Sequence, residues 1–192
     1  MKEKVLILGG ARSGKSSFAE KLACDYGQKV LYVATAEAGD REMKERIASH
    51  RKARPPAWTT LEAPLQVGRQ IMEAFNYADA VLIDCITLLV SNTVLSNTIH
   101  SGDNVDFHQV EAGVMWEIDG LIQCMDGIQA SFIIVSNEVG LGLVPDNTLG
   151  RLYRDVLGRA NQRLAAYVDR VYFMVSGIPL VVKPQIGGEG PY

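Results

Sequence analysis

The chain has 192 residues, of which 47% are hydrophobic and 21% charged, and its net charge at pH 7 is −3. These values are typical of one soluble globular domain, and the acidic balance argues against a general nucleic-acid binder, which carries a basic face. The apolar region at 80–90 contains Asp84 and is too short for a membrane span. From its first residues we expect no signal peptide, and its cysteines (Cys24, Cys85, Cys124) lack metal-ligand spacing. We therefore expect a reduced, cytoplasmic protein.

Five short apolar or β-branched runs predict strands that are covered on both faces. They lie at residues 5–8, 30–34, 80–83, 132–135 and 171–175. Amphipathic segments predict helices at 16–26, 41–51, 65–75, 107–125 and 149–168. This alternation predicts an α/β fold with a mainly parallel sheet and helices on both faces. We expect one catalytic domain over 1–186, a polar loop at 97–104 and a flexible tail at 187–192.

The first strand leads into a complete G-x-x-x-x-G-K-S motif. Its residues are Gly9, Gly10, Ala11, Arg12, Ser13, Gly14, Lys15 and Ser16. Between a strand and a helix, such a loop wraps a polyphosphate with backbone N–H groups, and the helix adds the positive end of its dipole. Lys15 is then expected to reach the β- and γ-phosphates, and the Ser16 hydroxyl to hold Mg²⁺. The motif predicts nucleotide binding without specifying the reaction.

Two further strands are followed by polar residues that are candidates for the same site. Asp84 ends the strand at 80–83, which we expect to neighbour the first strand, and its carboxylate is a candidate Mg²⁺ ligand. It is also placed to cap a helix that begins near Ile86. Asn137 and Glu138 follow the strand at 132–135, at the sheet edge where α/β proteins bind ligands. A turn that merely tolerates polar residues explains this pair equally well.

His50 lies at the end of the predicted helix 41–51, at the edge of its apolar face. The basic residues around it are Arg46, Arg51, Lys52 and Arg54. A partly packed histidine on a solvated basic helix end is one interpretation. The other is a nucleophile: a neutral imidazole nitrogen attacks phosphorus while the nearby cations stabilise charge on the phosphate oxygens.

Several motifs, in order along the chain, resemble those of one enzyme family. They are GGARSGKS at 9–16, YVATA at 32–36, EMKERIASHRKARP at 42–55, W-x-T-x-E at 58–62, DCIT at 84–87, SNEVGLGLVP at 136–145, GRLYRDVLGRANQRLA at 150–165 and VSGIPL at 175–180. The chain is similar to the bifunctional adenosylcobinamide kinase / adenosylcobinamide-phosphate guanylyltransferase family of cobalamin biosynthesis. The resemblance extends from about residue 5 to residue 183, and the segment after Lys183 matches nothing in it.

The resemblance implies a P-loop NTPase of RecA-like architecture, assembled as a homotrimer. It implies that ATP or GTP phosphorylates adenosylcobinamide, and that GTP then donates GMP to adenosylcobinamide phosphate through a covalent histidine–GMP intermediate on His50. Mg²⁺ would be held by Ser16 and Asp84. The implied nucleotide contacts are residues 9–16, Ala34, Thr35, Ala36, Arg51, Lys52, Ala53, Arg54, Glu62 and Asp84.

Two other functions remain possible on the residues alone. One is a P-loop kinase for another small molecule, without guanylyltransferase activity and with a structural His50. The other is a non-catalytic nucleotide-dependent switch on the same fold.

Overall fold

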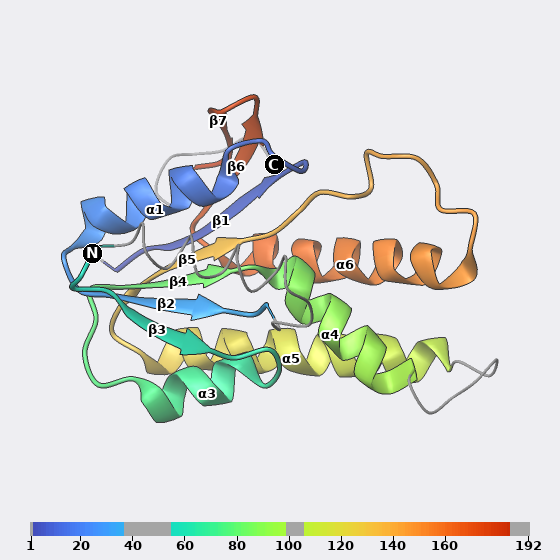
Figure 1. Cartoon of the computed structure of the whole chain (residues 1–192), viewed down its shortest axis with the longest axis horizontal. Helices are drawn as coiled ribbons and strands as arrows, with labels where there is room; N and C mark the ends of the chain where they lie inside the picture. Colours follow the sequence, from blue (N-terminus) through green and yellow to red (C-terminus); the bar gives the residue numbers. More distant parts are fainter. Residues whose placement is uncertain (1, 37–54, 99–105, 185–192) are drawn as a thin grey trace.

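The structure is a computed structural model that describes residues 2–36, 55–98 and 106–184 (Figure 1). In these ranges the strands are β1 (Lys4–Gly9), β2 (Val30–Ala34), β3 (Thr59–Glu62), β4 (Ala80–Asp84), β5 (Ser131–Val135), β6 (Arg170–Val175) and β7 (Ile178–Lys183). They form one sheet in the order β3-β2-β4-β5-β1-β6-β7. All neighbouring pairs are parallel except β6 and β7, which are antiparallel. A mainly parallel sheet is therefore confirmed.

Helices cover both faces of this sheet (Figure 1). They are α1 (Lys15–Tyr26), α3 (Val67–Ala74), α4 (Ile86–Thr98), α5 (Phe107–Gly127) and α6 (Thr148–Tyr167). Alternate strand residues face opposite sides: Val5 and Ile7 of β1 pack with α1, whereas Leu6 packs into the larger core with the other helices. The α/β class with helices on both faces is confirmed.

The sequence patterns did not predict β3 and β7, because neither strand is buried on both faces. β3 is an edge strand with partly exposed side chains, so only Leu61 is apolar. β7 is exposed along most of its length and contains Pro179, which weakens a strand pattern. The predicted helix 41–51 and the tail 187–192 lie outside the described residues.

The polar loop predicted at 97–104 is wrong for Asn97 and Thr98, because α4 continues through Thr98, and residues 99–104 lie outside the described ranges. The Asn97 side-chain amide donates a hydrogen bond to the carbonyl of Thr93 at 2.8 Å, and the Thr98 hydroxyl donates to the carbonyl of Leu95 at 3.2 Å. These side chains satisfy carbonyls of the last turns, so polar residues extend the helix here.

The order of the strands also corrects the expectation that β4 neighbours β1. β5 lies between them and pairs with both. Because β1, β4 and β5 are parallel, their carboxyl ends still meet at one edge of the sheet. Asp84 and Asn137 therefore belong to the same edge as the glycine-rich loop.

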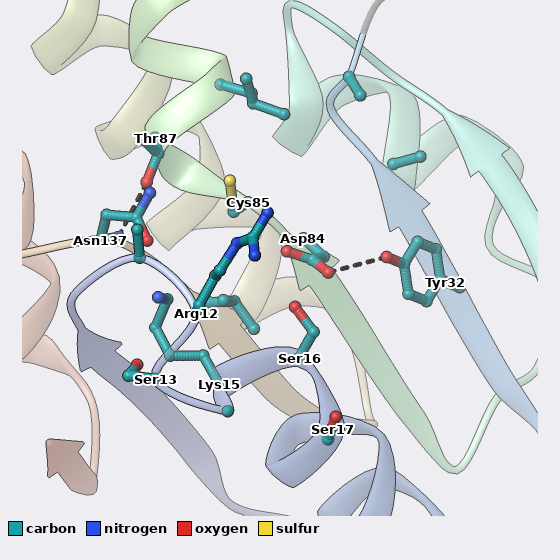
Figure 2. Close-up of a pocket in the computed structure, with 16 residues that line it drawn as sticks. Arg12, Ser13, Lys15, Ser16, Ser17, Tyr32, Asp84, Cys85, Thr87 and Asn137 are labelled. Atoms are coloured by element: carbon teal, nitrogen blue, oxygen red, sulfur yellow. Dashed lines mark hydrogen bonds between the residues drawn. The ribbon is translucent and has the colours of Figure 1, made fainter. Parts of the chain in front are cut away.

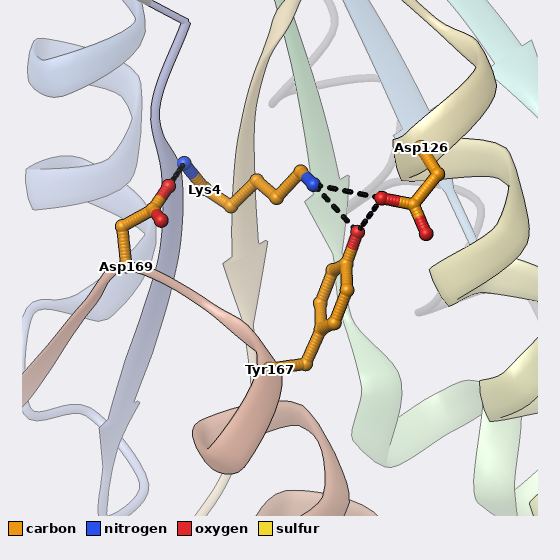
Figure 3. Close-up of polar contacts among 4 residues, drawn as sticks. All are labelled: Lys4, Asp126, Tyr167 and Asp169. Atoms are coloured by element: carbon orange, nitrogen blue, oxygen red, sulfur yellow. Dashed lines mark hydrogen bonds and ion pairs between the residues drawn. The ribbon is translucent and has the colours of Figure 1, made fainter. Parts of the chain in front are cut away.

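The opposite edge is fixed by a polar cluster around Lys4 (Figure 3). The Lys4 ammonium donates to Asp126 of α5 at 3.1 Å and to the hydroxyl of Tyr167, which itself donates to Asp126. The backbone N–H of Lys4 donates to Asp169 at 2.8 Å. Burial alone would lower the pKa of Lys4, but its bonds to Tyr167 and Asp126 raise it above the ordinary value. The amino end of β1 is thus tied to α5 and α6.

In the described part of the chain, the helices are too short or too polar to cross a membrane.

Candidate active site

A pocket of about 610 Å³ opens at the carboxyl edge of the parallel strands (Figure 2). Its walls come from residues 11–17, the carboxyl ends of β2, β4 and β5, and the first turn of α4. This is where the motif and the strand-end residues are expected to meet. The structure brings together most of the predicted loop, Ala34, Ala36 and Asp84.

The shape of the loop depends on two glycines. Gly9 and Gly14 have backbone φ angles of +149° and +94°, which residues with a side chain rarely adopt. A Cβ on Gly9 would lie 2.6 Å from the carbonyl oxygen of Met174, so the loop passes against β6 without room for a side chain. Gly14 precedes α1 and leaves its first turn without a side-chain cap. The N–H groups at this helix end are therefore available to an anion.

Lys15 points from α1 back over the loop. Only 8% of Lys15 is exposed, and its ammonium donates to the carbonyl of Gly10 at 2.6 Å. Burial lowers the pKa of Lys15, and the neighbouring Cys85 and Asp84 oppose this shift. The ammonium is held inside the loop, where a phosphate would neutralise its charge.

Asp84 faces Ser16 across the pocket (Figure 2). Asp84 accepts a hydrogen bond of 2.9 Å from the hydroxyl of Tyr32. A serine hydroxyl and a carboxylate are hard oxygen donors, and Mg²⁺ binds through few such groups together with substrate phosphates. The described residues contain no cluster of three or more His, Cys, Asp or Glu, so they offer no all-protein metal cage. The donor set fits a nucleotide-bound Mg²⁺.

Thr35 is fully buried and acts on the backbone rather than lining the pocket. Its hydroxyl donates to the carbonyl of Cys85 at 2.7 Å and accepts from the N–H of Cys85 at 2.8 Å. These bonds join the residues that follow β2 and β4. Burial, followed by the charge of Asp84, raises the pKa of Cys85 to about 11, so its thiol is neutral at physiological pH.

Asn137 and Glu138, which follow β5, lie in different surroundings. Asn137 lines the pocket, which favours the ligand-binding interpretation for this residue. Glu138 is not among the lining residues, and its carboxylate accepts from the N–H of Gly140 at 2.7 Å, as in a turn. Each of the two interpretations of this pair is therefore supported for one residue.

Other predicted residues are not brought to the pocket by the described chain. Glu62 ends β3 in register with Ala34, at the same sheet edge, but does not line the pocket. Gly9 and Gly10 begin the loop without lining the pocket, and the carbonyl of Gly10 accepts from the ammonium of Lys15. The predicted residues outside the described ranges are His50, Arg51, Lys52, Ala53 and Arg54.

The pocket also contains residues that the sequence analysis did not select. These are Ser17, Tyr32, Cys85, Thr87, Leu88 and Val135. Tyr32 belongs to the YVATA motif, while Cys85 and Thr87 belong to DCIT. These motifs could therefore have indicated the three residues as part of the site.

The chain is similar to known proteins over nearly its whole length. Residues 5–182 match the model of the family described as cobinamide kinase / cobinamide phosphate guanyltransferase. The bifunctional adenosylcobalamin biosynthesis protein CobP of Pseudomonas aeruginosa is 42% identical over 178 residues, covering 93% of this chain and 96% of the relative. The CobU proteins of Escherichia coli and Salmonella typhimurium are 40% and 41% identical, and each alignment covers 93% of this chain and 99% of the relative.

A solved structure from Pyrococcus horikoshii OT3 has a similar fold. Its TM-score is 0.53 at 9% sequence identity, and the match covers 96% of this chain and 88% of that chain. At this identity the likeness concerns the fold alone.

Proposed function

Because the chain belongs to the cobinamide kinase / cobinamide phosphate guanyltransferase family, we propose that it is a bifunctional transferase of cobalamin biosynthesis. It phosphorylates adenosylcobinamide with ATP or GTP and then transfers GMP from GTP to adenosylcobinamide phosphate. The observation that carries this proposal is the pocket that joins Lys15, Ser16 and Asp84 at one sheet edge.

In the first reaction the substrate hydroxyl attacks the γ-phosphorus of the nucleotide. The bond from that phosphorus to the β–γ bridging oxygen breaks, the nucleoside diphosphate leaves and the hydroxyl proton passes to solvent. Lys15 and the N–H groups at the start of α1 stabilise the charge on the phosphate oxygens. Ser16 and Asp84 would hold Mg²⁺, which supplies further neutralisation of the phosphates when bound.

In the second reaction we assign His50 as the nucleophile. An imidazole nitrogen bonds to the α-phosphorus of GTP, the bond from that phosphorus to the α–β bridging oxygen breaks, and pyrophosphate leaves with that oxygen. A phosphate oxygen of adenosylcobinamide phosphate then attacks the same phosphorus, the P–N bond breaks and His50 is regenerated. Two steps allow pyrophosphate to leave before the large acceptor occupies its space. The basic residues Arg51, Lys52 and Arg54 support this assignment by their position in the sequence.

Three further expectations belong to the same proposal. Residues 1–186 act as one catalytic domain, since the strands form one sheet within the described ranges. The protein is cytoplasmic, where its nucleotide substrates are found. It assembles as a homotrimer, so that a neighbouring subunit adds surface for the corrin ring.

GTP labelled at either the α- or the γ-phosphate tests the proposal. The α-label is expected to appear on the protein in an acid-labile, alkali-stable bond, and to be lost in His50→Ala. His108→Ala, on the exposed start of α5, is the matched control and retains the label. The His50→Ala variant is expected to retain phosphorylation of adenosylcobinamide.

Two outcomes would contradict parts of the proposal. Transfer of γ-label alone, to a small molecule, would indicate the simple kinase. Slow hydrolysis without transfer of either label would indicate the switch.

A further inference from the structure

The backbone of Asn137 is held from several elements at once. Its N–H donates to the Thr87 hydroxyl at 2.8 Å, and its carbonyl accepts from the Asn161 amide at 3.0 Å. The flanking N–H groups of Ser136 and Glu138 donate to β1, at the carbonyls of Ile7 and Gly9. The residue is therefore fixed relative to β1, α4 and α6.

The groups that hold Asn137 are themselves buried polar side chains. Ser136 is fully buried and Asn161 is 5% exposed, and the Ser136 hydroxyl donates to the Asn161 amide oxygen at 2.7 Å. Buried polar groups lose their hydration and therefore need hydrogen-bond partners, which Ser136 and Asn161 find in each other and in the carbonyl of residue 137. What this network achieves is a fixed position for the peptide of residue 137.

The side chain of Asn137 points into the pocket (Figure 2). Among the described residues no hydrogen bond of its amide is observed, whereas both of its backbone groups are bonded. In Figure 2, Asn137 and Asp84 enter the pocket from opposite sides of Lys15. A buried network thus positions an amide that faces the pocket.

The position of Asn137 indicates which part of a bound nucleotide it meets. The N–H of Glu138 bonds to the carbonyl of Gly9 at 3.1 Å, and the ammonium of Lys15 bonds to the carbonyl of Gly10. Both the Asn137 segment and the ammonium therefore lie at the start of the loop. Because the lysine of such a loop reaches the β- and γ-phosphates, Asn137 lies at the γ-phosphate end.

We propose that Asn137 is a further catalytic residue of the kinase step, and that its amide donates a hydrogen bond to the transferring γ-phosphoryl group. This inference rests on the proposed function. The amide adds no negative charge beside the phosphates, and it stabilises charge that develops on the equatorial oxygens as the phosphoryl group moves. Thr87 acts as a positioning residue through the N–H of residue 137.

The GMP transfer differs from phosphorylation in the phosphorus atom that reacts. That reaction occurs at the α-phosphorus, and the γ-phosphate leaves as part of pyrophosphate. Loss of a contact to the γ-phosphoryl group therefore affects phosphorylation far more than GMP transfer.

The experiment compares Asn137→Ala with wild type in the full-length protein. We expect kcat for phosphorylation of adenosylcobinamide to fall about 100-fold. The Kd of a non-hydrolysable GTP analogue and the α-label on the protein are expected to change less than about threefold, because the contact forms mainly in the transition state. Asn76→Ala, an exposed asparagine between α3 and β4, is the matched control and retains wild-type kcat.

Two further variants make the test specific. Asn137→Asp keeps the shape but places a carboxylate beside the phosphates, so we expect a similar loss of kcat and a weaker Kd that worsens at low salt. Thr87→Val removes the acceptor for the N–H of residue 137 and lowers kcat, whereas Thr87→Ser, which keeps the hydroxyl, restores it.

The outcomes separate this inference from the proposed function. Wild-type phosphorylation that persists in Asn137→Ala would overturn the role of Asn137 alone. A Kd that weakens as much as kcat falls would also overturn it, since the contact would then be uniform binding. If the wild type phosphorylates no adenosylcobinamide, the proposed function fails and this inference fails with it.

Discussion

The hydroxyl of Tyr32 donates a hydrogen bond of 2.9 Å to the carboxylate of Asp84, from the neighbouring strand. Tyr32 is almost fully buried, and its ring stacks with Trp58 at a centroid distance of 6.5 Å. The bond therefore comes from a fixed side chain. It orients one carboxylate oxygen and leaves the other directed toward the pocket that contains Ser16 (Figure 2).

Tyr32→Phe is expected to weaken the use of Mg²⁺ without unfolding the protein. The ring and its packing remain, while a hydrogen bond to a charged group, worth about 1.5–3 kcal/mol, is lost. We expect the Mg²⁺ concentration for half-maximal phosphorylation to rise about 3- to 10-fold, as the carboxylate becomes less ordered. A Mg²⁺ titration at saturating nucleotide measures this change.

Tyr77→Phe provides the control for this prediction. Tyr77 donates to Asp79 at 3.1 Å in an exposed position at the opposite end of β4, so the same atom is removed away from the pocket. An unchanged Mg²⁺ requirement in Tyr32→Phe would show that the bond does not order a metal ligand.

Alkylation by iodoacetamide is expected to distinguish the three cysteines by their surroundings. Burial raises the pKa of Cys124 to about 12, while burial and the charge of Asp84 raise that of Cys85 to about 11. The reactive species is the thiolate, which for Cys85 is about one part in a thousand at pH 8 and rises tenfold per pH unit toward pH 11. The exposed Cys24 therefore reacts first, as peptide mass spectrometry over a pH series will show.

Two control samples show which cysteines carry the label. Protein with Cys24→Ser is expected to remain unlabelled at pH 8, and denatured protein to label at all its cysteines. Labelling of Cys85 in the folded protein at the rate of Cys24 would mean that its thiol is not desolvated.

Gly68→Ala is expected to destabilise the protein through the contact between α3 and α5. A Cβ at this position would lie 2.3 Å from the carbonyl oxygen of Gly120, and backbone cannot move aside as a side chain can. The buried Glu117 holds the same contact closed, since its carboxylate accepts from the N–H of Gln66 at 2.6 Å. We expect a loss of about 1–3 kcal/mol in the free energy of unfolding, measured by urea denaturation.

Gly120→Ala is the matched variant on the facing helix. Nothing lies within 4 Å of its added Cβ, so we expect a gain of about 0.5–1 kcal/mol from helix propensity. Equal effects of the two substitutions would contradict the close approach of α3 and α5.

The sequence determined those features of the site that are local in the chain. The loop with Lys15 and Ser16 was identified because its glycine spacing and the strand before it belong to one short segment. Asp84 was found for the same reason, as a carboxylate at the end of an apolar run. The family followed from the order of the motifs, and the match over residues 5–182 confirms it.

Only the tertiary structure decided which distant residues meet. Strand order depends on pairing between segments far apart, which no local pattern encodes, so the position of β5 between β1 and β4 was missed. The difference between Asn137 and Glu138 also depends on tertiary structure, because only Asn137 lines the pocket, from a position that Thr87, 50 residues away, helps to hold. A polar residue at a strand end acquires its role from the partners that packing supplies.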